Sequence, residues 1–107
     1  MAVIWIGDGA TWSGAGWVLR YIAEGLRESK ALPQLNESFA AAEAGVPYID
    51  FRGLDRGERQ ILWKAMKTMV DDLKRGGPSS LRDPAFYPGL LDKLEVLERL
   101  IHTYGAE

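Results

Sequence analysis

The chain has 107 residues, no cysteine and a formal net charge of −2. A chain of this length has room for one hydrophobic core, so we expect a single globular domain over residues 1–107. The lack of cysteine excludes disulfides and thiolate metal sites, and the lack of a basic surplus disfavours nucleic-acid binding. No apolar run approaches the roughly 18 residues of a membrane span, and no signal peptide is recognisable, so we expect a cytoplasmic protein without membrane contact.

The N-terminal third predicts a strand, a glycine-rich connection and a helix. Ala2–Ile6 is apolar throughout and contains β-branched residues, which is typical of a buried strand. In the glycine-rich stretch 7–16, Trp12 stands where a dinucleotide-binding motif needs its third glycine, and the lysine of a P-loop is missing. We therefore interpret this stretch as a flexible turn with a helix N-cap at Thr11 or Ser13, followed by a helix over Ser13–Ser29.

The middle of the chain predicts a short helix and a second strand. Asn36–Ala44 is rich in alanine, a strong helix former, and Gly45 and Pro47 end it. A strand over Val46–Arg52 follows. Pairing of this strand with Ala2–Ile6 would give a two-stranded element, which needs helices to cover it because two strands alone are marginal.

The segment from Asp55 to Arg75 has the strongest helical pattern in the chain. Asp55 and Glu58 have the spacing of a capping box, and Gly76, Gly77 and Pro78 end the helix. Apolar residues recur along one helix face. They are Ile61, Leu62, Ala65, Met66, Met69, Val70 and Leu73.

A proline-bounded loop over residues 76–87 leads to a last helix from Pro88 to about Thr103. The loop is long enough for the last two helices to pack antiparallel. We expect their interface to form from Ile61, Leu62, Met66, Met69, Leu73, Leu90, Leu94, Leu97 and Ile101. The predicted fold class is α+β, mainly α, with about four helices and a small two-stranded β element.

Few residues suggest chemistry. His102 is the only histidine and lies in the last turn of a helix, where the helix dipole favours a cation. The acidic pair Asp71–Asp72, like Glu95 and Glu98, has basic residues nearby and is best interpreted as a solvated helix face. No nucleophile, base and oxyanion hole come together in a motif. We therefore expect no enzyme activity, no metal and no cofactor, and a small enzyme or ligand-binding domain is the least favoured interpretation.

Large aromatic residues outside the helical stripes are more informative. We expect a partner protein to contact Trp12, Arg82, Asp83, Phe86 and Tyr87. Arginine and bulky aromatics supply much of the binding energy at interface centres, and two prolines stiffen the loop that holds most of these residues. The alternatives stay open: Trp12 and Phe86 could instead close the core, and Asp83 could form a turn before Pro84. Trp5 and Trp17 are assigned to the core.

The order Y-I-D-F-R-G-L-D, an amphipathic helix, R-D-P-A-F-Y-P-G and a leucine-rich helix covers roughly residues 48–104. This arrangement resembles small bacterial immunity proteins that accompany polymorphic or contact-dependent toxins. The resemblance implies a cytoplasmic protein that binds and blocks one cognate toxin. The net charge is less acidic than that of many nuclease inhibitors, which disfavours a nuclease target. The main alternative is a non-catalytic structural or oligomerisation domain, and a homo-oligomer is left open.

Overall fold

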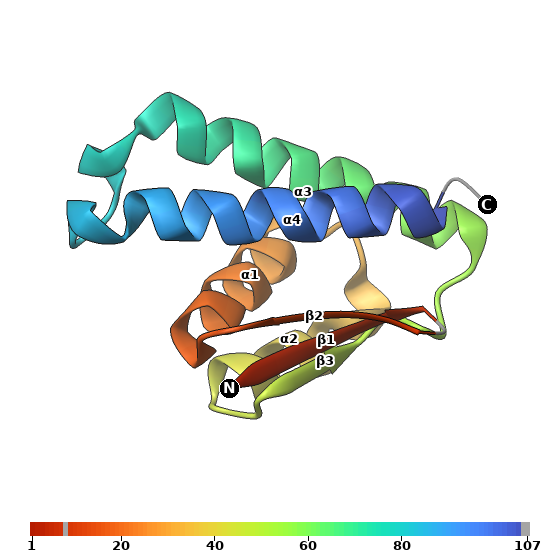
Figure 1. Ribbon diagram of the computed structural model, residues 1–107. Helices are drawn as coiled ribbons and strands as arrows, with labels where there is room; N and C mark the ends of the chain where they lie inside the picture. The colour runs from red at the N-terminus through yellow and green to blue at the C-terminus, as the bar shows by residue number, and fades with distance from the viewer. Residues whose placement is uncertain (8, 106–107) are drawn as a thin grey trace.

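The computed structural model describes residues 1–7 and 9–105 (Figure 1). Within these ranges the chain forms a small sheet and a larger helical part, which confirms the α+β, mainly α, class. Three single-turn 3-10 helices, Pro33–Leu35, Pro78–Ser80 and Pro84–Phe86, lie in the connections. No helix in the described ranges combines the length and apolar character needed to cross a bilayer. The elements are β1 (Ala2–Gly7), β2 (Ala10–Gly14), α1 (Gly16–Ser29), α2 (Asn36–Glu43), β3 (Tyr48–Asp50), α3 (Arg56–Gly76) and α4 (Tyr87–Gly105).

The sheet has three strands in the described residues, so the prediction of two strands was wrong. Its order is β2-β1-β3, with β1 antiparallel to β2 and parallel to β3. The additional strand, β2, comes from the glycine-rich stretch that we interpreted as a turn. Its residues alternate between buried Ala10 and Trp12 and exposed Thr11 and Ser13, which is the period of a strand. The N-cap prediction was also wrong, because Ala15 caps α1 without a side-chain hydrogen bond.

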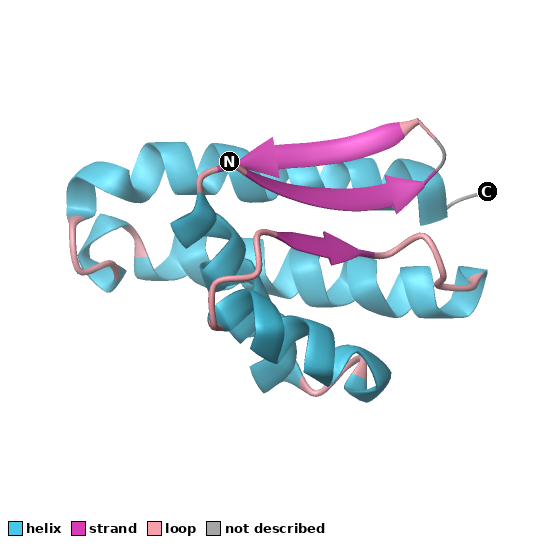
Figure 2. Cartoon of the chain, turned by 90° about the horizontal axis from the view of Figure 1, so that it is seen from below, coloured by secondary structure: helices cyan, strands magenta, loops and turns pink. Residues whose placement is uncertain are grey.

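The sheet is covered by helices on one face only. Figure 1 shows α3 and α4 lying across one side of the strands, and Figure 2 shows the opposite face open toward the viewer. In β1 the alternate residues Ala2, Ile4 and Ile6 are buried in the core. Trp5 has the opposite phase and lies outside the core cluster, so its assignment to the core was wrong.

The two long helices pack together as predicted, and they supply much of the core (Figure 1). The buried members of the predicted interface are Leu62, Met66, Leu73, Leu90, Leu94, Leu97 and Ile101. Met69 is only half-buried and Ile61 is 45% exposed, so the prediction was wrong for Ile61. The apolar face of α3 is wider than the part that α4 covers, because Ala65 and Met69 are partly buried against the core beside it and Ile61 is exposed.

The start of α3 is fixed by local and distant hydrogen bonds. The predicted capping box is present: the Glu58 backbone N–H donates to Asp55 Oδ1 at 2.8 Å, and the Asp55 backbone N–H donates to Glu58 Oε1 at 2.9 Å. The Arg59 guanidinium donates to the Ile6 carbonyl at 2.8 Å and to the Leu54 carbonyl at 3.1 Å. These contacts tie the beginning of α3 to the end of β1.

Candidate functional site

Trp12, the first of the predicted contact residues, lies in the core. Its side chain is 2% exposed, and its indole Nε1–H donates to the Lys93 carbonyl in α4 at 3.0 Å. The Lys93 ammonium donates in turn to the Ser13 carbonyl at 3.1 Å. Trp12 therefore fits the alternative of a core residue, and its side chain is not accessible to a partner.

The other four predicted contacts lie in the connection before α4 and at the helix start. Asp83 forms the turn that was the alternative to its contact role, since its Oδ1 accepts from the Ala85 backbone N–H at 3.0 Å. Arg82 is exposed, and Tyr87 is half-buried against the core. Phe86 is 52% exposed, one of the few large apolar side chains of the described chain that face solvent.

The exposed Phe86 ring does not stand alone. It contacts Trp17 of α1, with ring centroids 5.2 Å apart and planes tilted by 43°. Trp17 is itself half-buried and packs against the core, so its assignment to the core is confirmed in part. We call Trp17 and Phe86 the aromatic end patch. No sequence pattern predicted this pairing, because the two residues are far apart in the chain and no local pattern connects them.

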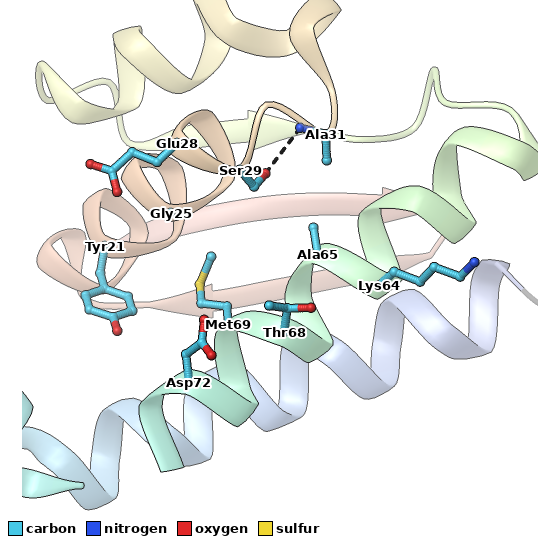
Figure 3. Close-up of a pocket in the computed structure, with 10 residues that line it drawn as sticks. All are labelled: Tyr21, Gly25, Glu28, Ser29, Ala31, Lys64, Ala65, Thr68, Met69 and Asp72. Atoms are coloured by element: carbon cyan, nitrogen blue, oxygen red, sulfur yellow. Dashed lines mark hydrogen bonds between the residues drawn. The ribbon is translucent and has the colours of Figure 1, made fainter. Parts of the chain in front are cut away.

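Helix α1 connects the aromatic end patch to a groove. Trp17, Tyr21, Gly25 and Glu28 are spaced by four, four and three residues, so they share one side of the helix. Beyond Trp17 this side borders a groove of about 630 Å³ between α1 and α3 (Figure 3). Its lining residues are Tyr21, Gly25, Glu28, Ser29, Ala31, Lys64, Ala65, Thr68, Met69 and Asp72.

The groove is apolar in its middle and charged at its rim. In Figure 3 the Met69 side chain extends from α3 toward Gly25 of α1. A Cβ atom at Gly25 would overlap the terminal methyl of Met69, so a larger residue at this position would displace the end of the Met69 side chain. The rim carries Glu28 and Asp72 as acidic residues and Lys64 as a basic one. The excess width of the apolar face of α3 was the sequence signal that could have predicted this groove.

Tyr21 marks the Asp72 end of the groove. Burial raises the pKa of its phenol above the ordinary value, and the negative charges of Asp72 and Glu24 raise it further. Tyr21 therefore keeps its proton at neutral pH, so its hydroxyl is able to donate a hydrogen bond and does not serve as a base. Asp72 also forms an exposed ion pair with Arg75. These groups can recognise a polar or cationic partner, but they do not form a nucleophile and base pair.

His102 lies apart from the groove and from the aromatic end patch. Its ring stacks on Trp63 with centroids 4.6 Å apart, and Trp63 Nε1–H donates to Glu98 Oε1 at 3.0 Å. Across residues 1–7 and 9–105, no three His, Asp or Glu side chains gather as a possible metal-binding group. The structure therefore gives His102 a stacking contact with Trp63.

A second exposed aromatic cluster lies on the open face of the sheet. Trp5 and Tyr48 have ring centroids 5.4 Å apart, and the Arg52 guanidinium lies 5.2 Å from the Trp5 centroid. Arg52 also donates to both carboxylate oxygens of Asp50, at 3.0 and 2.9 Å, which lowers the pKa of Asp50. The charged groups of this cluster are thus engaged with one another, although the Tyr48 side chain is 50% exposed.

We compared the chain with protein-family models, curated proteins and solved structures, and none of the three comparisons gave a match. The resemblance to immunity proteins therefore stays a prediction.

Proposed function

We propose that this chain is a non-enzymatic protein-binding domain and that the aromatic end patch anchors its partner. The observation that supports this proposal is the exposure of Phe86 beside Trp17, at a site held in place by a 3-10 turn. Large aromatic side chains with one face open are typical of the residues that supply most binding energy at protein interfaces.

The connection before α4 is suited to binding without a large loss of conformational freedom. Pro84 begins the turn Pro84–Phe86, and the Asp83 carboxylate accepts a hydrogen bond from the Ala85 backbone. Because the backbone around Phe86 is already ordered, docking would cost less entropy than for a flexible loop. In this proposal Phe86 and Trp17 bury apolar area, exposed Arg82 pairs with acidic or carbonyl groups at the rim, and Asp83 and Tyr87 hold the turn and the helix start.

The resemblance to immunity proteins suggests what the partner is. We propose a cognate bacterial toxin that meets this chain in the cytoplasm and is blocked by it. The chain is nearly neutral, so it does not complement a toxin with a strongly basic groove. We therefore expect a toxin that presents an apolar contact surface. A structural domain without a partner is the competing interpretation.

A pull-down with an affinity-tagged chain tests the proposal, with Phe86→Ala as the variant and Tyr48→Ala as the matched control. Tyr48 is a good control because its side chain is about as exposed as that of Phe86 but lies in β3 beside Trp5, on the open face of the sheet. We expect one bacterial protein to co-purify stoichiometrically with the wild type and with Tyr48→Ala. Phe86→Ala should weaken its binding by about 2 kcal/mol or more, which is about 30-fold.

Two results would contradict the proposal. If Phe86→Ala lowered thermal stability and left the affinity intact, Phe86 would be a lid on Trp17 rather than a contact residue. If the purified chain turned over a small substrate with no partner present, the protein-binding function itself would fail.

A further inference from the structure

β3 forms one edge of the sheet, and the backbone groups on its outer side have no partner among the described residues (Figure 1). The Pro47 carbonyl accepts from β1 at 3.0 Å, and the Phe51 N–H donates to β1 at 2.7 Å. In a parallel ladder the backbone groups of alternate residues point to the same side, so Tyr48 and Asp50 direct theirs away from β1. The outer side of β3 therefore offers N–H and C=O groups to another strand.

The other edge of the sheet, β2, is protected. Ser13 lies opposite Val3 in the register of β1 and β2, and Val3 directs its backbone groups to β3, so the Ser13 groups point outward. The Lys93 ammonium of α4 donates to the Ser13 carbonyl at 3.1 Å. A lysine and a covering helix at an edge strand both discourage the pairing of a further strand. The fold therefore closes the edge at β2 and leaves the edge at β3 open.

A cleft of about 280 Å³ follows the open edge, between β3 and α2. We call it the edge cleft. Ala41 and Val46 are half-buried and give it an apolar wall, and the Val46 backbone N–H donates to the Ala41 carbonyl at 3.0 Å, which ties α2 to the chain entering β3. A strand added to β3 would direct alternate side chains into this cleft. The lining residues are Glu37, Ser38, Ala41, Val46, Tyr48, Ile49 and Asp50.

The edge cleft has acidic lining residues and no basic one. Asp50 is engaged by Arg52 of its own chain, through hydrogen bonds to both carboxylate oxygens. Glu37 is exposed in the first turn of α2 and takes part in no ion pair with another described residue. A basic side chain of an occupant would therefore be attracted to Glu37, and an acidic one would be repelled.

We propose that the edge cleft binds an extended segment of another protein, which adds to β3 as a further strand and places a lysine or arginine beside Glu37. The open backbone groups of Tyr48 and Asp50 are two residues apart, which is the repeat of a strand, so an extended chain can pair with both. A helix has already paired its backbone groups internally and cannot do so. The edge cleft shares no residue with the aromatic end patch, so the two sites bind independently.

A capped peptide of alternating valine and threonine, with a lysine at each end, is the probe for the isotope-labelled full chain. In two-dimensional NMR we expect the amide signals of Tyr48 and Asp50 to shift and their hydrogen exchange to slow. The amides of Thr11 and Ser13 in β2 should stay unchanged. Methylating alternate amide nitrogens of the peptide removes the donors on one of its edges only. One methylation frame should therefore abolish binding, and the other should leave it intact.

Two substitutions at Asp50 separate the role of its backbone from that of its side chain. Both lose the ion pair with Arg52, but Asp50→Ala keeps the outward N–H and Asp50→Pro removes it. Proline is tolerated in an edge strand when its missing N–H faces away from the ladder, and circular dichroism checks that both variants fold. We expect Asp50→Pro to weaken peptide binding at least about tenfold and Asp50→Ala no more than about twofold. Glu37→Lys should also weaken binding, whereas Phe86→Ala should not change it.

Equal binding of the two methylated peptides would overturn the proposal, because main-chain pairing distinguishes the two frames. So would a peptide that moves no amide of β3 at millimolar concentration, or one that moves Thr11 and Ser13 instead. Concentration-dependent shifts at Tyr48 and Asp50 without peptide would assign the open edge to a second copy of the chain, against the proposal. If Asp50→Pro does not fold, the comparison of the methylated peptides still decides the outcome.

Discussion

Replacing Trp12 separates its two possible roles most directly. Trp12→Ala should destabilise the fold by about 3–5 kcal/mol, since the side chain is 2% exposed and its removal loses transfer energy and leaves a cavity. Trp12→Phe keeps most of the apolar volume but loses the hydrogen bond from Nε1 to the Lys93 carbonyl, which contributes about 1 kcal/mol. For a domain of this size, 1 kcal/mol corresponds to about 4–8 °C in melting temperature, so the alanine variant should melt at least about 12 °C below the wild type.

Urea denaturation followed by far-UV circular dichroism measures these changes. A lower midpoint with an unchanged m-value would report lost stability without a change in the surface exposed on unfolding. Binding to a partner, measured well below the unfolding transition, should be unaltered for Trp12→Phe. If Trp12→Ala instead unfolded within about 0.5 kcal/mol of the wild type, the indole could not be buried between β2 and α4, and the packing described above would be incorrect.

Three further predictions concern α3 and its groove. Met66→Ala should lower the free energy of unfolding by about 2–5 kcal/mol, while Ile61→Ala should change it by no more than about 0.5 kcal/mol. Equal losses in urea denaturation would refute the assignment of Met66 to the buried face and Ile61 to the exposed face of α3. Asp55→Ala should cost about 1 kcal/mol, because it removes the acceptor of the capping box; an unchanged urea midpoint would show that the cap contributes nothing. The pKa of Tyr21 is raised in the folded chain, by burial first and then by Asp72, so the folded state holds the phenol proton more tightly than the unfolded state. The contribution of Tyr21 to stability is complete below its pKa in the unfolded chain and is lost as the pH rises through its pKa in the folded chain. In an ultraviolet titration, Asp72→Asn should move the ionisation of Tyr21 to lower pH. An unchanged ionisation would exclude an effect of the Asp72 charge.

Some features of the surface could be predicted from the sequence and others could not. The proline-bounded composition is enough to predict a surface connection, and the Asp83 turn was one of the two alternatives that it suggested. The exposure of Phe86 was not decided by the sequence, which left a contact role and a core role open. The contact of Phe86 with Trp17 was not predictable, because it depends on where the end of the α3–α4 pair meets α1. The groove was likewise missed, since its shape requires the crossing of α1 and α3 at Gly25 and Met69.

The sequence by itself determined the elements whose signals are local. The capping box of α3, the 3.6-residue spacing of α3 and α4, and the glycines at the end of α3 all act within a few residues, and the structure reproduces them. The spacing along α3 and α4 had already predicted most of the buried residues of their interface, but only the tertiary structure decided the burial of Trp5, Trp12 and Ile61. Trp5 and Trp12 are both aromatic residues in the N-terminal segment, yet Trp12 is enclosed against α4, 81 positions away in the chain, while Trp5 lies on the open face of the sheet. A side chain is buried only when another element packs against its face. For β2 and for Ile61, distant parts of the chain determine whether such an element is present.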